Sequence, residues 1–504
     1  MLTVFLYKLS KIFKIAIIFI NILDLCRLGL YNKLINDEKR KIFMYTWNYD
    51  YSKTLWMKMF LARPDFDHGR SEVLITFEQA LEIVKAVDNM TKGVKKIVYL
   101  VGWQGLGHDD CHPVMEPVND ALKRDCDATG RESLLWLYSE AKKYNTVISV
   151  HVNVSDAVAV TPILDELAAA NALCNDLSGK PAVLQTLNGR DCYKTSYPQL
   201  WDSGIFKRII DRFCALFPVR EAGTLHLDNF CIAESLNPKT YLGEQDAARN
   251  KMLDYLQELG VDVTSEYTYR EAHFRNESVT HPNRKLLYAS AGEDMTEIPW
   301  EDVPIRTLGK IPATWWTSQV SMRECMQIPP AVYSGHLTDK KLLDVFYGAM
   351  HGEDIWMKHS VEAKDWAGEF LRQFCTLQLP YFYLNRYERQ SYREEDGDYT
   401  VFFSDGVVSE GKTGRITKNG ALLKDGGNVL LPLDEENTVF IAYSENGRTG
   451  EWEIPDAAFT KADVFRITPD GCNPAGTAGI ADGKIALSLA PGEALRIQGK
   501  NNDE

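Results

Sequence analysis

The sequence lacks the features that mark several common classes of protein. Its ten cysteines are scattered along 504 residues and include no Cys-x-x-Cys pair, which argues against a zinc ribbon and a dense disulfide framework. Basic residues are too few to balance the acidic ones, at 56 against 70. The net charge of −14 would repel a phosphate backbone, so nucleic acid is not an expected partner. Reduced thiols and a neutral or polar substrate are expected instead.

Long apolar runs are also absent, which bears on the first 43 residues. The apolar run at residues 15–23 is short for a spanning helix, which needs roughly 20 residues. Within residues 1–43, basic side chains outnumber acidic ones eight to three. A start codon assigned upstream of Met44 would explain this extension; a signal or membrane anchor and an amphipathic helix on the body are alternatives. We expect a cytoplasmic protein, with membrane attachment or secretion through residues 1–43 as the alternative.

Composition changes again near residue 394. All ten histidines and ten of the eleven tryptophans precede it, whereas 15 of the 34 glycines lie from Gly397 onward. Asp-Gly, Asn-Gly and Gly-Gly turns separate short β-rich runs there, at residues 399–403, 428–431, 438–443 and 484–489. The pattern predicts an antiparallel β-sandwich at residues 394–504, behind a larger domain at residues 44–393.

The larger domain alternates strand-like with helix-like segments. The strand-like ones, rich in β-branched and aliphatic residues, are 96–101, 146–154, 224–230 and 261–267. The amphipathic ones are 132–144, 205–217 and 245–259. This β-α-β-α order predicts a parallel α/β sheet, and the domain length suits a TIM-like (β/α)8 barrel.

Polar side chains follow one face of the second strand. Between residues 146 and 155, apolar residues alternate with Ser149, His151, Asn153 and Ser155. Alternate side chains of a barrel strand face the lumen, and active residues gather at the strands' carboxyl ends. The face predicts a site, although His151 and Asn153 bonded to each other in a filled core would also explain it.

Two further strands repeat the pattern and end in carboxylates. One places His226 and Asp228 on the same side, and the next places Glu266 there. Glycoside hydrolysis needs two such groups at one rim: one attacks or stabilises the oxocarbenium-like centre, and the other protonates the leaving oxygen. Rim carboxylates also bind metals or cap helices, and the pattern alone leaves these readings open.

A glycine-rich turn after the first strand carries rings and carboxylates. Residues 101–113 read VGWQGLGHDDCHP and contain Trp103, His108 and Asp109. An aromatic face that stacks on a sugar, with imidazole or carboxylate partners for its hydroxyls, suits a sugar subsite. A metal site of His108, Cys111 and His112 is the alternative, but no spaced ligand set completes it.

A later segment, ATWWTSQV at residues 313–320, contains Trp315, Trp316 and Gln319. Beside a turn these side chains suit the wall of a sugar site, and a place in the core is equally open. The sequence has no nucleophile elbow, P-loop or dinucleotide fingerprint. The paired carboxylates are therefore the leading candidates for chemistry.

Four segments, in chain order, resemble a known family: VGWQ…GHD, AKKYNTVISVHVN, HLDNF and VTSEY. They are similar to the catalytic barrel of glycoside hydrolase family 101, the endo-α-N-acetylgalactosaminidases, and of the related family 129 α-N-acetylgalactosaminidases. The resemblance covers about residues 45–390 and continues into a family-like β-sandwich. It implies Asp228 as nucleophile and Glu266 as acid/base.

The resemblance implies further roles. His108 and Asp109 match the family's sugar-binding Gly-His-Asp motif, and His151 matches its strand histidine. Gln319, beside the paired tryptophans, resembles another subsite position. Of the tryptophan lid that clamps a disaccharide in family 101, only Trp201 lies in the expected neighbourhood. Family 101 enzymes are usually longer, so an exo-acting relative like family 129 is an alternative to endo action.

We expect a retaining α-glycoside hydrolase that removes α-linked N-acetylgalactosamine (GalNAc) or Gal-β1,3-GalNAc from glycans or glycopeptides. No metal or other cofactor is expected, no membrane contact is expected for the body of the chain, and no oligomeric state is predicted. The expected substrate-binding residues are Trp103, His108, Asp109, His151, Asn153, Trp201, His226, Trp315, Trp316 and Gln319. The alternatives are a non-catalytic glycan-binding barrel and a metal-dependent barrel hydrolase.

Overall fold

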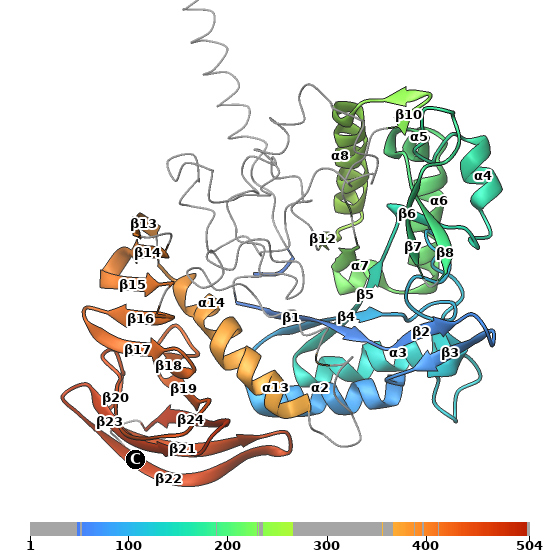
Figure 1. Ribbon diagram of the computed structural model, residues 1–504. Helices are drawn as coiled ribbons and strands as arrows, with labels where there is room; N and C mark the ends of the chain where they lie inside the picture. The colour runs from blue at the N-terminus through green and yellow to red at the C-terminus, as the bar shows by residue number, and fades with distance from the viewer. Residues whose placement is uncertain are drawn as a thin grey trace, which may run out of the picture. The chain divides into compact units, whose positions relative to one another are not determined.

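The fold is given by a computed structural model (Figure 1). The structure describes residues 48–50, 53–187, 189–228, 230, 235–265, 355, 366–387, 389–395, 398–411 and 413–500. The chain divides into two compact units, Met1–Asn48 and Tyr49–Glu504, and the elements below belong to the second.

A parallel sheet forms the first half of this unit. In the described part of the chain its strand order is β1 (Leu55–Phe60), β4 (Lys96–Val101), β5 (Thr146–Val152), β9 (Thr224–Leu227) and β12 (Asp262–Ser265). Each strand pairs in parallel with the next, so chain order and sheet order agree. The predicted parallel α/β sheet is confirmed. The part of the predicted (β/α)8 barrel that would follow β12 lies outside the described residues.

The sequence explains why these strands are internal. β4 reads KIVYLV, and all six of its residues are buried. Strands buried on both faces are typical of parallel sheets whose connections are helices. Helix α2 (Phe77–Thr91) is one such connection, and it begins with a capping box between Thr76 and Gln79.

The predicted amphipathic segments are helical. They form α3 (Gly130–Ala141), which continues as a 3-10 turn over Lys142–Tyr144, α6 (Ile205–Leu216) and α8 (Leu242–Glu258). Shorter helices are α4 (Leu164–Ala169), α5 (Tyr197–Asp202) and α7 (Val219–Ala222). Helices α2 and α3 lie side by side (Figure 1). None of the helices in the described ranges has the length and apolar character that crossing a membrane requires.

Small antiparallel sheets form in the segments that connect the strands of the parallel sheet. β2 (Ala62–Asp65) and β3 (Arg70–Val73) form a hairpin after β1, and β10 (Ser235–Leu236) pairs with β11 (Lys239–Thr240). Between β5 and α5 the chain forms an antiparallel sheet of β6 (Asp156–Val158), β8 (Arg190–Lys194) and β7 (Val183–Leu187), in that order. Its register sets Asp156 opposite Lys194. The segment that forms this sheet therefore brings Lys194, which is distant in the sequence, close to the end of β5.

The C-terminal region is an antiparallel sheet of twelve strands, orange to red in Figure 1. In spatial order they are β13 (Arg389–Glu395), β14 (Asp398–Phe403), β15 (Val407–Glu410), β16 (Arg415–Lys418), β17 (Ala421–Asp425), β18 (Asn428–Pro432), β19 (Val439–Ser444), β24 (Glu493–Gly499), β21 (Lys461–Thr468), β22 (Gly471–Ala481), β23 (Lys484–Leu489) and β20 (Arg448–Glu453). Apolar side chains of β18, β19, β21 and β24 share a buried core with those of β20 and β23. The predicted antiparallel β domain is thus present. The two strands that end this order, β23 and β20, share a core with strands in its middle.

A helical segment precedes this sheet. α13 (Trp366–Gln373) continues through a π-helical turn, Phe374–Gln378, into α14 (Leu379–Leu384). The first strand, β13, begins at Arg389, so the domain boundary predicted between residues 393 and 394 falls inside a strand. Residues at the two ends of this strand pair with β14 in one ladder.

Candidate functional site

Neighbouring strand ends and one loop bring polar side chains together. Strands β5 and β9 pair so that His151 lies opposite His226, and the backbone N–H of Asp228 donates to the carbonyl of Val152 at 2.8 Å. Asn153 therefore directly follows β5, beside Asp228, which directly follows β9. The site is built at the carboxyl ends of the strands, where parallel α/β folds place their ligands.

Asn153 connects two carboxylates. Its side-chain Nδ2 donates to Asp228 Oδ2 at 3.2 Å and to Asp156 Oδ2 at 2.9 Å. Its Oδ1 accepts the backbone N–H groups of Ser155 and Asp156, both at 2.9 Å. Since those backbone donors can face only the oxygen, the amide nitrogen must face the carboxylates. The turn after β5 thus fixes which way Asn153 presents its donors.

Three histidines pack against each other beside Asp228. The rings of His151 and His226 stack with centroids 5.3 Å apart, and His108 meets His151 edge-on at 5.1 Å. His151 Nε2 lies 3.4 Å from Asp228 Oδ2, and a hydrogen bond of 2.8 Å joins His226 Nδ1 to Thr264 Oγ1 on β12. His226 is fully buried and packs against the ring of His151. His108 keeps part of its side chain exposed.

The loop after β4 carries His108 and Asp109, and two glycines hold it against β2. Gly102 has φ +74°, and a Cβ there would lie 2.0 Å from the carbonyl oxygen of Ala62. A Cβ on Gly107, at φ +140°, would lie 2.6 Å from Arg63 Cα. Only glycine allows this approach, and it lets the His108 N–H donate to the Ala62 carbonyl at 2.9 Å.

The same loop contains side chains that could hold a metal ion. His108 Nε2 and His112 Nε2 lie 3.4 and 3.2 Å from the two carboxylate oxygens of Asp109. Among the described residues, two groups have ligand atoms all within 4.8 Å of one another: His108, Asp109 and His112, and His108, His151 and Asp228. Two imidazoles and a carboxylate suit a borderline transition metal such as zinc.

The cysteine of the predicted metal set does not join either group. Cys111 Sγ donates to the carbonyl of Val114 at 3.5 Å. Burial, and then the charges of Asp110 and Glu116, raise the pKa of the Cys111 thiol to about 12. In the group formed by His108 and His112, the third ligand atom comes from Asp109, which takes the place predicted for Cys111.

A second thiol lies near the acidic groups. Burial, and then the charges of Asp156, Asp109 and Asp228, raise the pKa of Cys192 far above its usual value. The thiol stays protonated at neutral pH and is a poor nucleophile. The nucleophilic group that the cluster offers is therefore a carboxylate, and Asp228 retains a side-chain exposure of 12%.

The predicted site residues separate into three sets. The structure brings together His108, Asp109, His151, Asn153, His226 and Asp228. Trp103 and Trp201 lie elsewhere, as described next. Glu266, Trp315, Trp316 and Gln319 lie outside the described residues.

Trp103 is a core residue and does not present a ring to a sugar. It has no exposed surface, its indole N–H donates to the carbonyl of His151 at 3.0 Å, and its ring packs against Phe213 of α6. The expectation of a stacking platform at Trp103 is corrected: the left-handed turn at Gly102 directs the chain so that the indole packs against a helix.

Trp201 does not join the cluster. It lies on α5, and its ring packs near Phe206 and Tyr255 with the Lys207 ammonium 4.4 Å from its centroid. These neighbours belong to α6 and α8, so Trp201 packs among helices. The expectation that it contributes to a lid over the site has no support from these contacts.

Two members of the cluster were not expected from the sequence. Asp156 and Lys194 are fully buried, and Lys194 Nζ lies 3.2 Å from Asp156 Oδ1. Asp156 directly follows the polar face of β5, which is a signal for it. No signal relates Lys194 to that position, because the pairing depends on the antiparallel excursion of β6 to β8.

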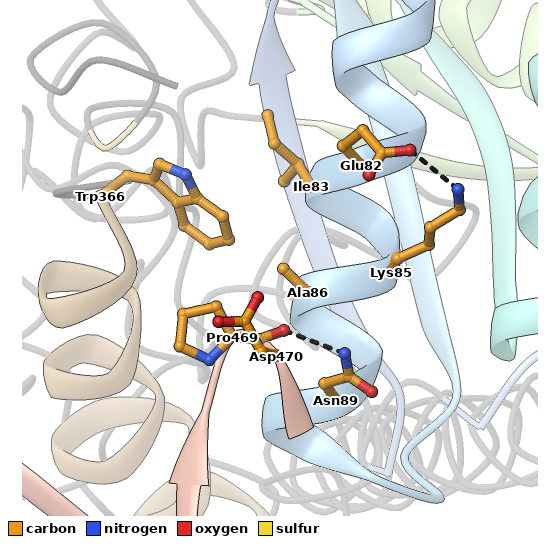
Figure 2. A pocket seen from close by; sticks show the side chains of 8 residues that line it. All are labelled: Glu82, Ile83, Lys85, Ala86, Asn89, Trp366, Pro469 and Asp470. Atoms are coloured by element: carbon orange, nitrogen blue, oxygen red, sulfur yellow. Dashed lines mark hydrogen bonds and ion pairs between the residues drawn. The ribbon is translucent and has the colours of Figure 1, made fainter. Parts of the chain in front are cut away.

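A separate hollow lies away from this cluster. Figure 2 shows it between α2, Trp366 and the turn before β22. Its volume is about 260 Å³. Asn89 Nδ2 donates there to the carbonyl of Pro469 at 2.9 Å, and Glu82 pairs with Lys85 at 2.8 Å. The first contact ties α2 to the C-terminal sheet, the second lies within α2, and the hollow shares no residue with the cluster.

Fold and site together define an α/β protein with a polar, carboxylate-bearing cluster at the ends of parallel strands. Residues 62–172 match the model of glycoside hydrolase family 101, described as endo-α-N-acetylgalactosaminidase. This match confirms the predicted resemblance over a stretch that includes His108, Asp109, His151 and Asn153. No sequence among the curated proteins is significantly similar to the chain.

Several solved structures are similar to part of the chain. The α-N-acetylgalactosaminidase NagBb from Bifidobacterium bifidum, in its GalNAc complex, is 12% identical with a TM-score of 0.42 over 73% of this chain and 58% of that one. The maltogenic α-amylase AmyB from Thermotoga neapolitana is 10% identical with a TM-score of 0.37, over 90% of this chain and 100% of that one. The chain spans 34–58% of the length of the NagBb structures. Likenesses at these identities and scores establish no activity for this chain.

Proposed function

We propose that the protein is a retaining α-glycoside hydrolase that acts on α-linked GalNAc or Gal-β1,3-GalNAc, with Asp228 as nucleophile and Glu266 as acid/base. The observation that carries the proposal is the placement of Asp228: it directly follows β9, keeps 12% of its side chain exposed, and receives a hydrogen bond from Asn153. A carboxylate held at a strand end, accessible yet oriented by neutral donors, suits attack on an anomeric carbon.

The strand register supports the partner. β9 and β12 pair in parallel with Leu227 opposite Ser265, and Glu266 is the next residue in the sequence. The side chains of His226 and Thr264 meet on one face, and the two-residue alternation of a strand predicts positions 228 and 266 for the same face. Carboxyl groups on adjacent strands suit the roughly 5 Å spacing of a retaining pair.

The chemistry proceeds in two displacements. Asp228 attacks the anomeric carbon while Glu266 gives its proton to the departing glycosidic oxygen, which leaves a glycosyl ester on Asp228. Glu266, now ionised, takes a proton from water, and the hydroxide attacks the same carbon. The ester bond breaks, Asp228 regains its charge, and the sugar leaves with its original anomeric configuration.

The loop residues suit recognition of the sugar. His108 and Asp109 keep side-chain exposures of 20% and 17%, so their polar atoms can reach hydroxyl or acetamido groups. Their stretch of sequence is the one that matches the endo-α-N-acetylgalactosaminidase model, which supports GalNAc as the sugar. The proposal leaves endo and exo action as alternatives. The size of the aglycone that the enzyme accepts distinguishes them.

The proposed location is the cytoplasm. The seven cysteines that the structure describes form no disulfide bonds with one another, which suits a reducing compartment.

Nitrophenyl α-glycosides of GalNAc, Gal-β1,3-GalNAc and galactose test the proposal, with Asp228→Asn as the control. Release of nitrophenol from either of the first two substrates by the wild type, lost in the variant, is the expected result. Glycan binding without turnover would replace the proposal with a non-catalytic glycan-binding barrel.

One observation favours a second candidate, a metal-dependent hydrolase: the two His-His-Asp groups in the loop and at β5 and β9. In the second group Asp228 would be a ligand, which would withdraw it from nucleophilic attack. Removal of metal ions distinguishes the two candidates.

A further inference from the structure

A buried lysine stands behind the proposed nucleophile. Lys194 and Asp156 face each other across β8 and β6, with Nζ 3.2 Å from Oδ1 and side-chain exposures of 0% and 2%. The other oxygen of Asp156 accepts Asn153 Nδ2 at 2.9 Å, and the same nitrogen donates to Asp228 Oδ2 at 3.2 Å. An unbroken chain of polar contacts therefore runs from the Lys194 ammonium to the Asp228 carboxylate.

The charges along this series of polar contacts explain why a buried lysine is needed there. One amide nitrogen bridges two carboxylates, so two negative charges lie on either side of Asn153. In a buried setting such charges repel strongly unless a cation compensates one of them. Lys194 supplies that cation to one oxygen of Asp156, and the other oxygen accepts the Asn153 amide and holds it in place.

We propose that Lys194 is a positioning residue that acts through Asp156 and Asn153 to hold Asp228 oriented for attack. The inference rests on the proposed function, in which Asp228 is the nucleophile. Lys194 has no exposed surface and does not reach a substrate itself. Its contribution therefore belongs to the turnover number, with little effect on the affinity for the sugar.

The alternative is that Lys194 only stabilises the fold. Another buried lysine in the same chain, Lys96, provides a matched control for this alternative. Lys96 is the first residue of β4, at the amino end of a strand of the same parallel sheet, and its side chain is also fully buried. Its Nζ lies 2.6 Å from Asp88 Oδ1. Replacing either lysine with methionine removes a buried cation from an aspartate, but only one of these aspartates contacts Asn153.

The first experiment compares Lys194→Met with Lys96→Met on a nitrophenyl α-GalNAc substrate, with rates normalised to the folded fraction. Both variants are expected to melt at lower temperature, because breaking a buried pair leaves an uncompensated charge. Lys194→Met is expected to lower kcat at least tenfold with KM changed less than threefold, and Lys96→Met is expected to leave both near wild type. Equal kcat values in the two variants would overturn the inference.

The second experiment adds Asp156→Asn to Lys194→Met. The asparagine carbonyl still accepts from Asn153 but carries no charge, so repulsion with Asp228 is removed. The double variant is expected to regain most of the lost kcat. Recovery of thermal stability without any recovery of kcat would show that Lys194 does not act through the charge of Asp156, and it would overturn the route proposed.

Crystal structures separate this inference from the proposed function. In Lys194→Met the contact between Asn153 Nδ2 and Asp228 Oδ2 is expected to lengthen beyond hydrogen-bond distance, while Lys96→Met keeps it. That result does not require turnover. An inactive wild type would refute the proposed function alone, whereas an unchanged Asn153–Asp228 contact in Lys194→Met would refute the positioning role.

Discussion

Asn153 and Asp228 are 75 positions apart in the chain, yet the side-chain amide of one donates to the carboxylate of the other at 3.2 Å. The contact exists because β5 and β9 are neighbours in a parallel sheet and both residues follow the last paired positions. It joins the turn after β5, which fixes the amide, to the carboxylate proposed to attack the substrate.

Leaving-group dependence separates the two proposed catalytic carboxylates. Glu266→Gln should nearly abolish cleavage of a natural Ser/Thr glycoside but retain more activity on a nitrophenyl glycoside, whose leaving group hardly needs protonation. Asp228→Asn should lose about 10³-fold or more on both, which is roughly 4 kcal/mol of barrier. Steady-state kinetics on paired substrates measure this, and equal losses for both variants on every substrate would contradict the assignment.

Much of this arrangement is accessible from sequence because the strands obey simple patterns. β4 and β23 span the predicted residues, since each is a short apolar or alternating run bounded by clear breaks. β1 is not predicted, because Lys58 interrupts its run LWMKMF; the lysine is nevertheless buried. The contacts of the folded chain here offset the free-energy cost of burying the charged side chain of Lys58.

The site is less accessible from sequence than the strands. The alternation in β5 and β9 is enough to place His151, Asn153, His226 and Asp228 on one face. It does not reveal the direction of Trp103, which depends on the positive φ at Gly102, or the pairing of Lys194 with Asp156, which depends on the register of β6 and β8. Such features come from turn geometry and long-range register, which local patterns do not encode.

Trp103 provides a test of the corrected assignment. Because its ring is buried against Phe213, Trp103→Ala should lower the free energy of unfolding by about 3–5 kcal/mol. Trp103→Phe loses chiefly the hydrogen bond to the His151 carbonyl and should cost about 1 kcal/mol. Denaturant titration measures both. A large rise in KM for the phenylalanine variant, with stability unchanged, would instead restore the sugar-stacking role.

Chelation addresses the metal groups. Double displacement by two carboxylates needs no Lewis acid, so exhaustive treatment with a chelator should leave kcat and KM on nitrophenyl α-GalNAc within about twofold of the untreated enzyme. Asp109→Asn and mass spectrometry of metal content serve as controls. Activity that disappears on chelation and returns with added zinc would favour the metal-dependent hydrolase.

Removal of residues 1–43 tests the predicted extension. These residues differ in charge from the remainder, and Met1–Asn48 forms a unit apart from Tyr49–Glu504. A chain that begins at Met44 should be soluble, with the melting temperature and kcat of the full chain. Aggregation or lost activity of the shortened chain would show that the extension contributes to the fold.

The central claim is that Asp228 forms a covalent bond with the sugar, and trapping that bond tests it most directly. A 5-fluoro GalNAc fluoride should react quickly and release slowly, because the fluorine destabilises both transition states while fluoride departs easily. Peptide mass spectrometry of the trapped enzyme should then find the sugar on Asp228, with no label in Asp228→Asn. A label on another residue, or an unlabelled enzyme that releases the β anomer first by NMR, would contradict the account.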